Sequence, residues 1–368
     1  MQRFRAISKR ACWKVSPSML DLRIVRSPLT ASENRQILLE YNRLTKAGIP
    51  TSEFEHWVQK SPAGPAWHAI LETTGGRIVG HTSLIPLKTS FTREKLIPAK
   101  SEFSFVHEDF RSAKINGFEK GRIKFLVIVN ELFSHGIKQG WGPYFVSTAE
   151  ANHPLSRRVG CKNAEFPLTE CLLIRNATRA ARETPNLSGK QRASLFAVGL
   201  GHKLAWTGNR LFANSNGNVR PVSVGLGGVV PVTDRLSFFE DADSLCWRYF
   251  EDQYLRFSFE GSTQDYAIVK RGDANRFARI VQWRIQHLDH ASGLASKLLR
   301  FADQDNALGL RWAVYDSDPL AKPLVALLRR RGFLCKPRIR TLMLHSQKPV
   351  YAEAASWNVN DSLVSFDP

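Results

Sequence analysis

The stretch from Ser101 to Cys161 constrains the fold of this chain more than any other segment. An apolar strand pattern leads into a basic loop that carries Gly117 and Gly121. A helical pattern, a short apolar strand at 144–146 and a second short helix follow in that order. Helix N-termini and their free backbone N–H groups bind phosphate groups. The order therefore predicts an α/β unit with a site for a phosphate-bearing cofactor.

The second half of the chain repeats this order in outline. Two apolar runs, 266–269 and 277–281, flank a turn as the strands of a hairpin do, and a helix and a further strand follow. Each half then closes on a short helix that ends in Arg-x-Gly. A tryptophan-bearing segment is also repeated, and we interpret Trp57 and Trp247 as core anchors or as walls of an acceptor cleft. The same order at similar spacing predicts a duplicated α/β unit.

Changes in composition along the chain predict where its domains begin and end. The connector between the halves contains a pattern at 190–212 that fits a glycine-interrupted basic helix. Such a helix either lies on an anionic membrane surface or packs between domains. The predicted segments are a flexible basic N-terminus (1–20), a first domain (21–178), a linker (179–220), a second domain (221–347) and a C-terminal tail (348–368).

The balance of charge favours anionic partners. Lys and Arg number 52 against 33 Asp and Glu, which gives a formal net charge of +19. The basic residues are spread along the chain and no nucleic-acid-binding motif accompanies them, so a dedicated nucleic-acid-binding function is not favoured. A phosphorylated cofactor, an acidic glycan and a membrane surface stay open as partners.

The cysteines and the hydropathy of the chain indicate a reducing compartment. Five cysteines without CxxC spacing favour reduced thiols over a disulfide scaffold or a zinc site, and the histidines show no paired spacing for a metal. No run approaches the roughly 18 apolar residues of a membrane span, and the first residues lack the apolar core of a signal peptide. We therefore expect a cytoplasmic protein, with peripheral membrane contact left open.

Several short motifs are similar to those of one enzyme family. They are Gly80–Pro86, Val106–Arg111 and Gly160–Cys161 in the first half, and Trp247–Tyr249 and 324–333 in the second. With them, residues 20–362 resemble the tandem GNAT-like (GCN5-related N-acetyltransferase) acyltransferases of bacteria. The resemblance implies an α/β fold of two GNAT-like domains in tandem, each a mixed twisted sheet flanked by helices. It also implies an N-acyltransferase that uses acetyl-CoA or another acyl-CoA as its substrate.

The resemblance places the acyl-CoA site in the first half. The loop after Arg111 lacks glycines at the family's positions, and its own glycines come later, as in a lengthened loop. The second half has no glycine-rich loop at the corresponding place. Asn152 resembles a cofactor-contacting position of the family, and it is equally a natural helix cap. The implied cofactor site consists of Phe105, Val106 and His107, through backbone groups, and of Arg111, Lys114, Gly117, Gly121, Arg122, Asn152 and Ser156.

Candidate acid and base residues lie near the same loop. Acyl transfer to an amine requires a base for the ammonium proton and often an acid for the leaving thiolate. Glu102 alternates with Ser104 on the apolar strand, so its side chain points either into the cleft or out to solvent. Glu108 is the second candidate base; its alternative interpretation is a solvated residue at the start of the loop. The family's acid is a tyrosine on the helix after the fifth strand; that helix has none here, and Tyr144 is the candidate that is left.

The sequence predicts a CoA-dependent N-acyltransferase, with an acetyl group as the expected cargo and an amine as the acceptor. An amino sugar or a polysaccharide precursor as acceptor rests on the family resemblance alone. Two alternatives stay open. The altered loop and the missing tyrosine suit a non-catalytic scaffold protein of the same fold. The net charge suits an aminoacyl-tRNA-dependent transferase of the related tandem fold.

Overall fold

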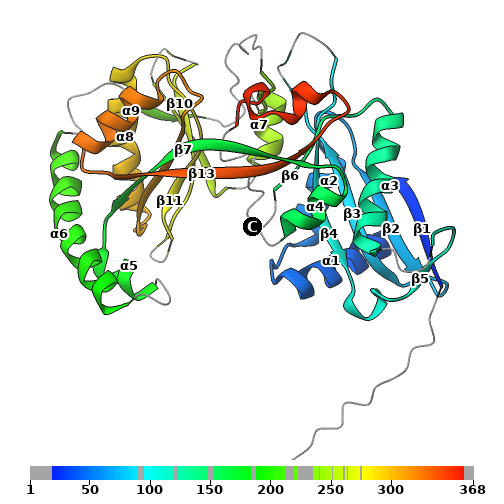
Figure 1. The fold of residues 1–368 in the computed structure, drawn as a ribbon. Coiled ribbons are helices and arrows are strands. Elements are labelled where there is room, and N and C mark those ends of the chain that lie inside the picture. Colours follow the sequence, from blue (N-terminus) through cyan, green and yellow to red (C-terminus); the bar gives the residue numbers. More distant parts are fainter. Residues whose placement is uncertain are drawn as a thin grey trace, which may run out of the picture.

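Two α/β halves are joined through one continuous sheet (Figure 1). In this computed structural model the described residues are 19–89, 91, 95–119, 123–147, 152–183, 188–212, 219–222, 235–239, 241–250, 252–259, 262, 264–273 and 276–359. Within them the 13-stranded sheet has the order β5-β1-β2-β3-β4-β6-β13-β7-β12-β11-β10-β9-β8. The predicted mixed α/β architecture is confirmed, and the two expected sheets are continuous with each other.

The strands and helices of each half follow the predicted order. The first half comprises β1 (Met19–Arg26), α1 (Ala31–Thr45), α2 (Thr51–Gln59), β2 (Trp67–Thr73), β3 (Ile78–Pro86), β4 (Ala99–Val106), η1 (Glu108–Phe110), β5 (Lys114–Ile115), α3 (Lys124–Lys138), β6 (Tyr144–Val146), α4 (His153–Arg158) and β7 (Lys162–Ile174). The remainder comprises α5 (Ala177–Glu183), α6 (Gly189–Phe212), β8 (Val219–Val222), α7 (Ala242–Arg248), β9 (Tyr254–Phe259), β10 (Tyr266–Lys270), β11 (Ala278–Arg284), α8 (Leu288–Gln304), β12 (Gly309–Tyr315), α9 (Ala321–Arg330), β13 (Leu334–His345), η3 (Pro349–Ala352) and η4 (Ala354–Ser356).

Local chemistry sets the ends of two elements that border the site. The N-cap of α1 is Thr30, because Thr30 and Glu33 form a reciprocal capping box. β4 ends at Val106. There His107 Nδ1 accepts a hydrogen bond from the Asp109 N–H at 3.2 Å and so starts the short helix η1.

Helices cover both faces of the first-half sheet. α3 packs on β2 and β3, where Ile128 and Leu132 lie with Leu71 and Leu84 in one buried cluster. α1 and α2 cover the opposite face, and their apolar side chains belong to a larger core that continues into the second half. β3 lies between these layers and is buried along its whole length. The first half is therefore a three-layer unit that holds β4 and α3 in fixed positions.

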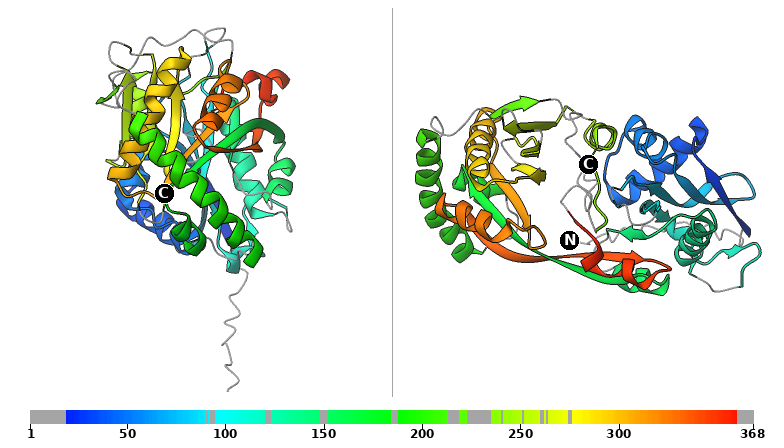
Figure 2. Two further views of the ribbon diagram at one scale, coloured as in Figure 1. Left: turned by 90° about the vertical axis from the view of Figure 1, so that its left-hand side faces the viewer. Right: turned by 90° about the horizontal axis from the view of Figure 1, so that it is seen from above.

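The long helix α6 lies on the outer side of the second half (Figure 2). It contacts α8 and β7, and Trp206 is buried in the core of that half. The predicted helix is thus present, but it packs on one half and not between the two. No helix of the described ranges is long and apolar enough to cross a membrane.

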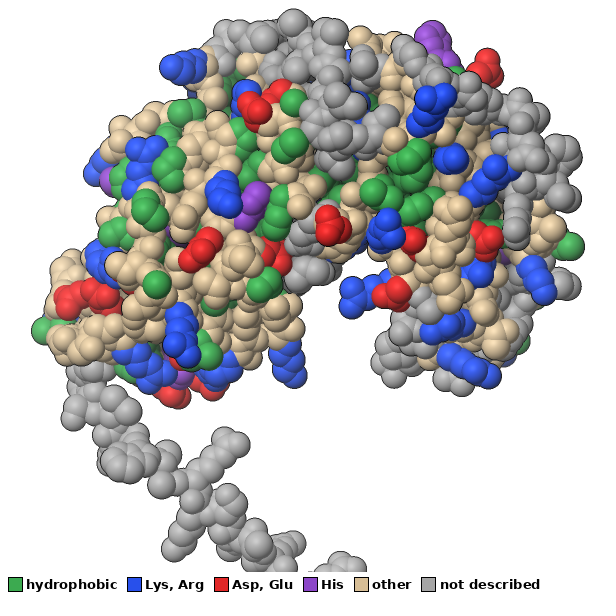
Figure 3. All heavy atoms as spheres, turned by 180° about the vertical axis from the view of Figure 1, so that it is seen from behind, with side chains coloured by type: hydrophobic (Ala, Val, Ile, Leu, Met, Phe, Trp, Pro, Cys, Tyr) green, Lys and Arg blue, Asp and Glu red, His purple; other side chains and the backbone are tan. Residues whose placement is uncertain are grey.

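The last strand of each half is exchanged with the other half. β7 leaves the first half and pairs antiparallel with β12 from Leu168 to Ile174. β13 returns from the second half, pairs with β7 over the length of both strands and reaches β6 through Met343 and Leu344. In Figure 1 the two strands form the arch between the halves, and Figure 3 shows an open notch beneath it. The predicted domain limits at residues 178 and 221 stay predictions. The exchanged strands pair across these limits.

The repeated tryptophan segments contact each other across the molecule. Trp57 of α2 and Trp247 of α7 are both buried, and their rings meet edge to face with centroids 5.1 Å apart. His56 Nε2 donates a hydrogen bond to the Trp247 carbonyl at 2.7 Å, and Trp247 Nε1 donates to the His56 carbonyl at 3.3 Å. The contact is nearly reciprocal, as expected where the two copies of a duplicated unit pack on each other. Their interpretation as core anchors is confirmed.

Candidate active site

The site begins where two parallel strands separate. β4 and β6 are paired only through Ala99 with Tyr144 and Lys100 with Phe145. Beyond this point β4 continues to Val106 without a ladder partner in β6. Backbone N–H and C=O groups on that side of β4 are thus available for a ligand, because such groups require partners when water is excluded. The opening lies inside the first half.

A bulge in β4 accompanies the separation. The register between β3 and β4 shifts by one residue between His81 and Ser83, so β4 carries an extra residue there. Phe103 at this place has a φ of 53°, in the left-handed region that only glycine adopts freely. Its ring is held by edge-to-face contacts with Tyr41 and Phe54, at centroid distances of 5.4 and 4.9 Å. Because bulges bend and twist a strand, this one turns β4 away from β6.

A cavity of about 680 Å³ fills the opening. This volume lies within the range of about 300–1,000 Å³ that is typical of small-molecule sites. We call it the β4–β6 pocket. All of its lining residues come from the first half: Tyr41, Thr45, Glu102, Phe103, Ser104, Val106, Arg111, Ile123, Lys124, Phe125, Val146, Ser147, Asn152, Leu155 and Ser156.

The pocket brings together five of the residues that the sequence singled out. They come from β4, from the segment after η1 and from the start of α4, and they are Glu102, Val106, Arg111, Asn152 and Ser156. Asn152 precedes α4 but its side chain makes no capping hydrogen bond there. Asn152 nevertheless occupies the N-cap position of α4, as one of its two interpretations expected, and it also lines the pocket.

Glu102 lines the pocket, and a buried lysine fixes its carboxylate. Its side chain is 19% exposed and forms an ion pair with Lys100, two residues earlier on the same face of β4. The Lys100 side chain is only 1% exposed, so this cation fixes the carboxylate from inside the protein. The alternative of a solvent-facing strand residue is wrong for Glu102, because the carboxylate lines a cavity.

Tyr41 is a site residue that the sequence did not identify. It lies on α1, faces the pocket beside Glu102 and contacts Phe103. Burial, and then the negative charge of Glu102, raise the pKa of Tyr41 to about 12, so the phenol stays protonated near neutral pH. The family resemblance pointed to the helix after the fifth strand, and Tyr144 was the remaining candidate; both lie far from α1 in the sequence. The sequence signal for Tyr41 is its position one helical turn after the apolar residue Leu38.

The cationic end of the pocket lies at the N-terminus of α3. Lys124 is the first residue of this helix, and Arg111 lines the same pocket from the segment after η1. The first turn of α3 contains no acidic residue, so its N–H groups and its dipole favour an anion. Burial lowers the pKa of Lys124. The arrangement suits the binding of a phosphorylated group, although the loop before α3 lacks the glycine spacing of the family.

Phe105, Val106 and His107 were expected to offer backbone groups, and only Val106, the last residue of β4, is placed to do so. The N–H of His107 is bonded to the Val79 carbonyl of β3 at 2.8 Å, which turns it away from the pocket. Opposed pairs of an antiparallel ladder alternate in hydrogen bonding, so Phe105, paired with His81, faces β3 as well. Val106 then directs its backbone groups to the opposite side, where it lines the pocket.

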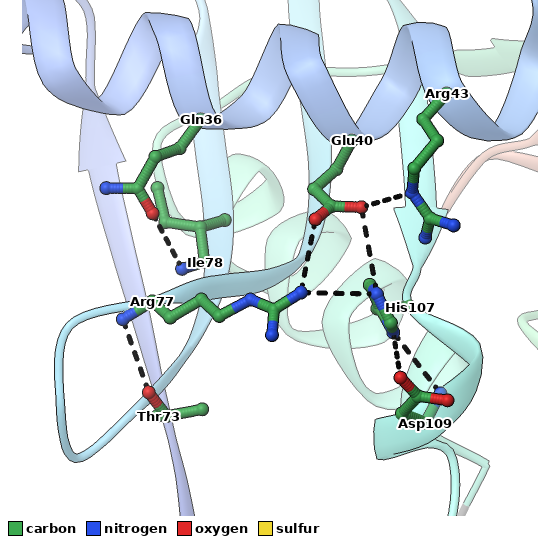
Figure 4. Close-up of polar contacts among 8 residues, drawn as sticks. All are labelled: Gln36, Glu40, Arg43, Thr73, Arg77, Ile78, His107 and Asp109. Carbon is green, nitrogen blue, oxygen red and sulfur yellow. Dashed lines mark hydrogen bonds and ion pairs between the residues drawn. The ribbon is translucent and has the colours of Figure 1, made fainter. Parts of the chain in front are cut away.

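His107 belongs to a separate polar cluster with Glu40, Arg77 and Asp109 (Figure 4). Its Nε2 lies 3.3 Å from an Arg77 guanidinium nitrogen and 3.8 Å from a Glu40 carboxylate oxygen. Burial opposes ionisation of Glu40, but hydrogen bonds from Arg43 and Arg77 lower its pKa. This cluster fastens α1 to the end of β4, so it supports the pocket without lining it.

Three further predicted site residues, Glu108, Lys114 and Gly117, do not line the pocket. Glu108 is exposed on η1, as its solvated alternative expected, and Lys114 is exposed on the edge strand β5. Gly117 follows β5 with a φ of 77°, and Gly121 and Arg122 lie outside the described residues. The structure therefore does not bring Glu108, Lys114 or Gly117 to the pocket, and the roles of all five residues stay predictions.

Tyr144 is directed into the core under α3. Its hydroxyl is hydrogen-bonded as a donor to the Trp141 carbonyl at 2.9 Å, with the Phe133 carbonyl 3.3 Å away. Burial raises its pKa, which suits a structural phenol. Tyr144 does not line the β4–β6 pocket, so its predicted role as the acid lacks a geometric basis. Among the described residues no group of three His, Cys, Asp or Glu side chains could hold a metal ion.

The corresponding place in the second half is closed. β11 and β12 are parallel and paired from Ala278 with Leu310 to Ile280 with Trp312, and the ladder then ends. Trp283 spans the opening beyond it, because its Nε1 donates a hydrogen bond to the Ala313 carbonyl of β12 at 3.2 Å. The same divergence of strands is therefore filled by an indole in one half and by a cavity in the other.

Comparison with solved structures places this fold. A probable N-acyltransferase of Enterococcus faecalis has a TM-score of 0.56 at 11% identity, over 88% of this chain and 72% of that one. A GCN5-related N-acetyltransferase of Anabaena variabilis has a TM-score of 0.53 at 11% identity, over 88% and 72%. A tandem GNAT protein of the clavulanic acid pathway has a TM-score of 0.50 at 11% identity, over 88% and 98%.

Neither protein-family models nor curated protein sequences match this chain. The likeness is therefore one of fold, at identities too low to transfer a substrate.

Proposed function

We propose that this chain, which has the GNAT-like acyltransferase fold, transfers an acyl group from an acyl-CoA to an amine. The β4–β6 pocket is the observation that carries the proposal. One cavity joins a carboxylate, a protonated phenol, a strand edge without a ladder partner and a cationic helix end. These are the groups that acyl transfer from a phosphorylated thioester to an amine requires.

The residues of the pocket fit an acyl-CoA in two parts. The N-terminus of α3, Arg111 and Lys124 would hold the phosphates through charge and backbone N–H groups. Val106, on the free side of β4, would pair with the amide groups of the pantetheine arm as an added strand does. When bound, this substrate supplies the activated acyl group.

Glu102 and Tyr41 are the proposed catalytic residues. Glu102 accepts the proton of the incoming ammonium, so that the free amine attacks the thioester carbonyl carbon. Lys100 is a positioning residue, because it fixes the carboxylate that would otherwise rotate. Tyr41 donates a hydrogen bond to the sulfur or oxygen that gains charge as the C–S bond breaks. Its high pKa makes it a hydrogen-bond donor that keeps its proton.

The acceptor is proposed to be a small amine that carries hydroxyl groups, such as an amino sugar or its polysaccharide precursor. Three residues with hydroxyl groups, Tyr41, Thr45 and Ser104, line the pocket with Glu102. The Thr45 hydroxyl also donates to the Tyr41 carbonyl, and the Ser104 hydroxyl is hydrogen-bonded to that of Thr82. These groups can donate and accept hydrogen bonds with a polyhydroxylated acceptor. The proposal of a sugar comes from the family resemblance, and the hydroxyl-bearing residues of the pocket wall are consistent with it.

Calorimetric titration with acetyl-CoA tests the cofactor assignment. We expect micromolar binding to the wild type and binding about tenfold weaker in Arg111→Ala, because a charge-assisted contact to a phosphate is lost. Lys114→Ala is the matched control, since this exposed lysine lies outside the pocket. Absence of binding by acetyl-CoA and by longer acyl-CoAs would overturn the proposal and favour the non-catalytic scaffold. Binding of tRNA that weakens steeply with salt, without CoA affinity, would favour the aminoacyl-tRNA-dependent alternative.

A further inference from the structure

Two cysteines face each other in the strands that link the halves. Cys171 of β7 and Cys335 of β13 are directly opposed in the antiparallel register, and their sulfur atoms are 2.6 Å apart. Opposed residues in such a ladder have Cα atoms about 4.5–5.5 Å apart, within the separation of about 4.4–6.8 Å that a disulfide bridges. Both thiols are free in this structure. A bond between them requires no movement of either strand.

The two thiols differ in their surroundings. Cys171 is fully buried in the core of the second half and donates its S–H to the sulfur of Cys335, which is half-buried. That hydrogen bond, together with the nearby Arg329 guanidinium, lowers the pKa of Cys335. The same hydrogen bond, and then burial, raise the pKa of Cys171. Cys335 is therefore the thiolate-forming member of the pair, and Cys171 holds the shared proton.

The side of Cys335 adjoins open space. Arg329, whose guanidinium helps to lower the pKa of Cys335, also lines a cavity of about 610 Å³ between α9 and β7. Thr169, two residues before Cys171 on β7, lines the same cavity. The volume is enough for a small peptide-like molecule. Neither cysteine lines the cavity itself, but Cys335 is half-buried whereas Cys171 is buried, so a small oxidant reaches the pair at Cys335.

We propose that Cys171 and Cys335 form a reversible disulfide site whose oxidant is a low-molecular-weight disulfide. The Cys335 thiolate attacks one sulfur of that disulfide, a new S–S bond forms, and one thiolate leaves with its electron pair. Cys171, having lost its proton to that leaving thiolate, attacks the Cys335 sulfur and releases the second thiol. The balance is two protein thiols and one small disulfide in, and one protein disulfide and two small thiols out.

The bond would join parts of the chain that are 164 residues apart in sequence. It would lie in the two exchanged strands, so that it locks β13 to β7 and with it the connection between the halves. A cross-link over so long a loop restricts the unfolded chain and stabilises the folded one. Oxidation is therefore expected to raise the melting temperature, and a small dithiol to return it to the reduced value.

Peptide mapping under non-reducing conditions tests the site. The reduced full-length protein is incubated with oxidised glutathione, digested and analysed by mass spectrometry, with Cys246→Ser as the control because Cys246 is exposed and distant in sequence. We expect a linked peptide that contains Cys171 and Cys335, in the wild type and in the control alike, together with a higher melting temperature. A cross-link that involves Cys246 instead, or no protein disulfide at all, would overturn the proposal.

Two single variants separate the roles of the thiols. Cys171→Ser is expected to accumulate a mixed disulfide with glutathione on Cys335, because no second thiol resolves it. Cys335→Ser is expected to leave Cys171 unmodified, since this sulfur is buried and holds its proton more tightly. The reverse pattern of adducts would contradict the assignment of Cys335 as the attacking thiol. Neither readout depends on acyl transfer.

Discussion

The two halves share a topology but differ at the place where their central parallel strands separate. In the first half β4 and β6 diverge around a cavity of about 680 Å³. In the second half β11 and β12 diverge too, but the Trp283 indole bridges the strands. A duplicated fold therefore supplies the divergence of strands twice, and in the second half a bulky side chain spans it. Fold likeness alone does not assign a site to either half.

The two halves also support their bulged strands differently. In the first half His81 donates to the Phe103 carbonyl at 2.8 Å, and His68 and Ser27 extend the chain of hydrogen bonds at 3.0 and 2.7 Å. In the second half, where the register between β10 and β11 also shifts, the amide of Gln282 donates to the Phe239 carbonyl at 3.0 Å. The imidazole of a histidine takes up a proton in mild acid, whereas the amide of a glutamine does not. Lowering the pH should therefore destabilise the first half before the second.

The largest expected effect is the loss of catalysis in Glu102→Gln. The amide retains the shape of the side chain but cannot accept the ammonium proton, so kcat/KM for acetyl transfer should fall by about two orders of magnitude. Steady-state kinetics with an amino-sugar acceptor provides the measurement. Glu108→Gln, the same change at an exposed position outside the pocket, should keep wild-type rates. Equal losses in both variants would remove Glu102 from the mechanism.

The second prediction concerns pH. Burial lowers the pKa of His81 from 6.5 to about 4, and burial together with His81 lowers that of His68. The unfolded chain then binds more protons than the folded chain, so the free energy of unfolding falls as pH drops from 6.5 toward 4. His81 alone accounts for a loss of about 3 kcal/mol over this window. Urea unfolding at a series of pH values measures it.

A matched histidine variant isolates the buried pair. His287→Asn changes an exposed ring and should retain the full pH dependence, whereas His81→Gln should be less stable at pH 7 and flatter below it. Hydrogen exchange at pH 5 should show β4 exchanging before β11. Simultaneous opening of both strands would contradict the difference between the halves.

The third prediction opens the closed half. Trp283→Ala removes a half-buried indole and its hydrogen bond, at a cost of about 2 kcal/mol in the free energy of unfolding. Calorimetry should still show one acyl-CoA per chain, since the loop that follows β11 contains no glycine-rich phosphate site. Trp283→Phe serves as the control that keeps a ring and loses only the N–H donor. A stoichiometry of two would show that Trp283 alone distinguishes the halves.

The smallest effect is expected at the contact between the repeated segments. His56→Ala removes the hydrogen bond to the Trp247 carbonyl and the stacking of the imidazole on Phe250. We expect a loss of about 1 kcal/mol in the free energy of unfolding, with acyl-CoA affinity unchanged. Thermal denaturation with and without ligand checks both. A loss of affinity would show that the contact between the halves also shapes the pocket.

Local patterns were enough to predict most elements and the duplication. Apolar periodicity placed α3 and β12, and the repeated tryptophan-bearing segments identified Trp57 and Trp247 as core anchors. Alternation along β4 also placed Glu102 and Ser104 on one face, and both line the pocket. These features depend on residues that are neighbours in sequence, where the physical signal of burial is periodic.

Features that depend on distant residues could not be predicted. The bulge of β4 is accompanied by packing of Phe103 against Tyr41 and Phe54, which lie on α1 and α2. Tyr41 reaches the pocket because α1 crosses β4, a contact without a local signal. The pairing of β7 with β13 joins segments that lie far apart in the sequence, and no pattern in either strand specifies its partner.

The exchange of β7 and β13 also governs when the first half can be completed during synthesis. The β6 edge of its sheet is covered by β13, whose residues begin at Leu334. A ribosome that has finished β7 at Ile174 must therefore translate for on the order of ten seconds before that strand exists. Throughout this interval the nascent chain presents an open strand edge, the kind of surface that pairs with other chains. Dependence on chaperones before release, and loss of the first half in C-terminal truncations, are the expected biological signs of this order of assembly.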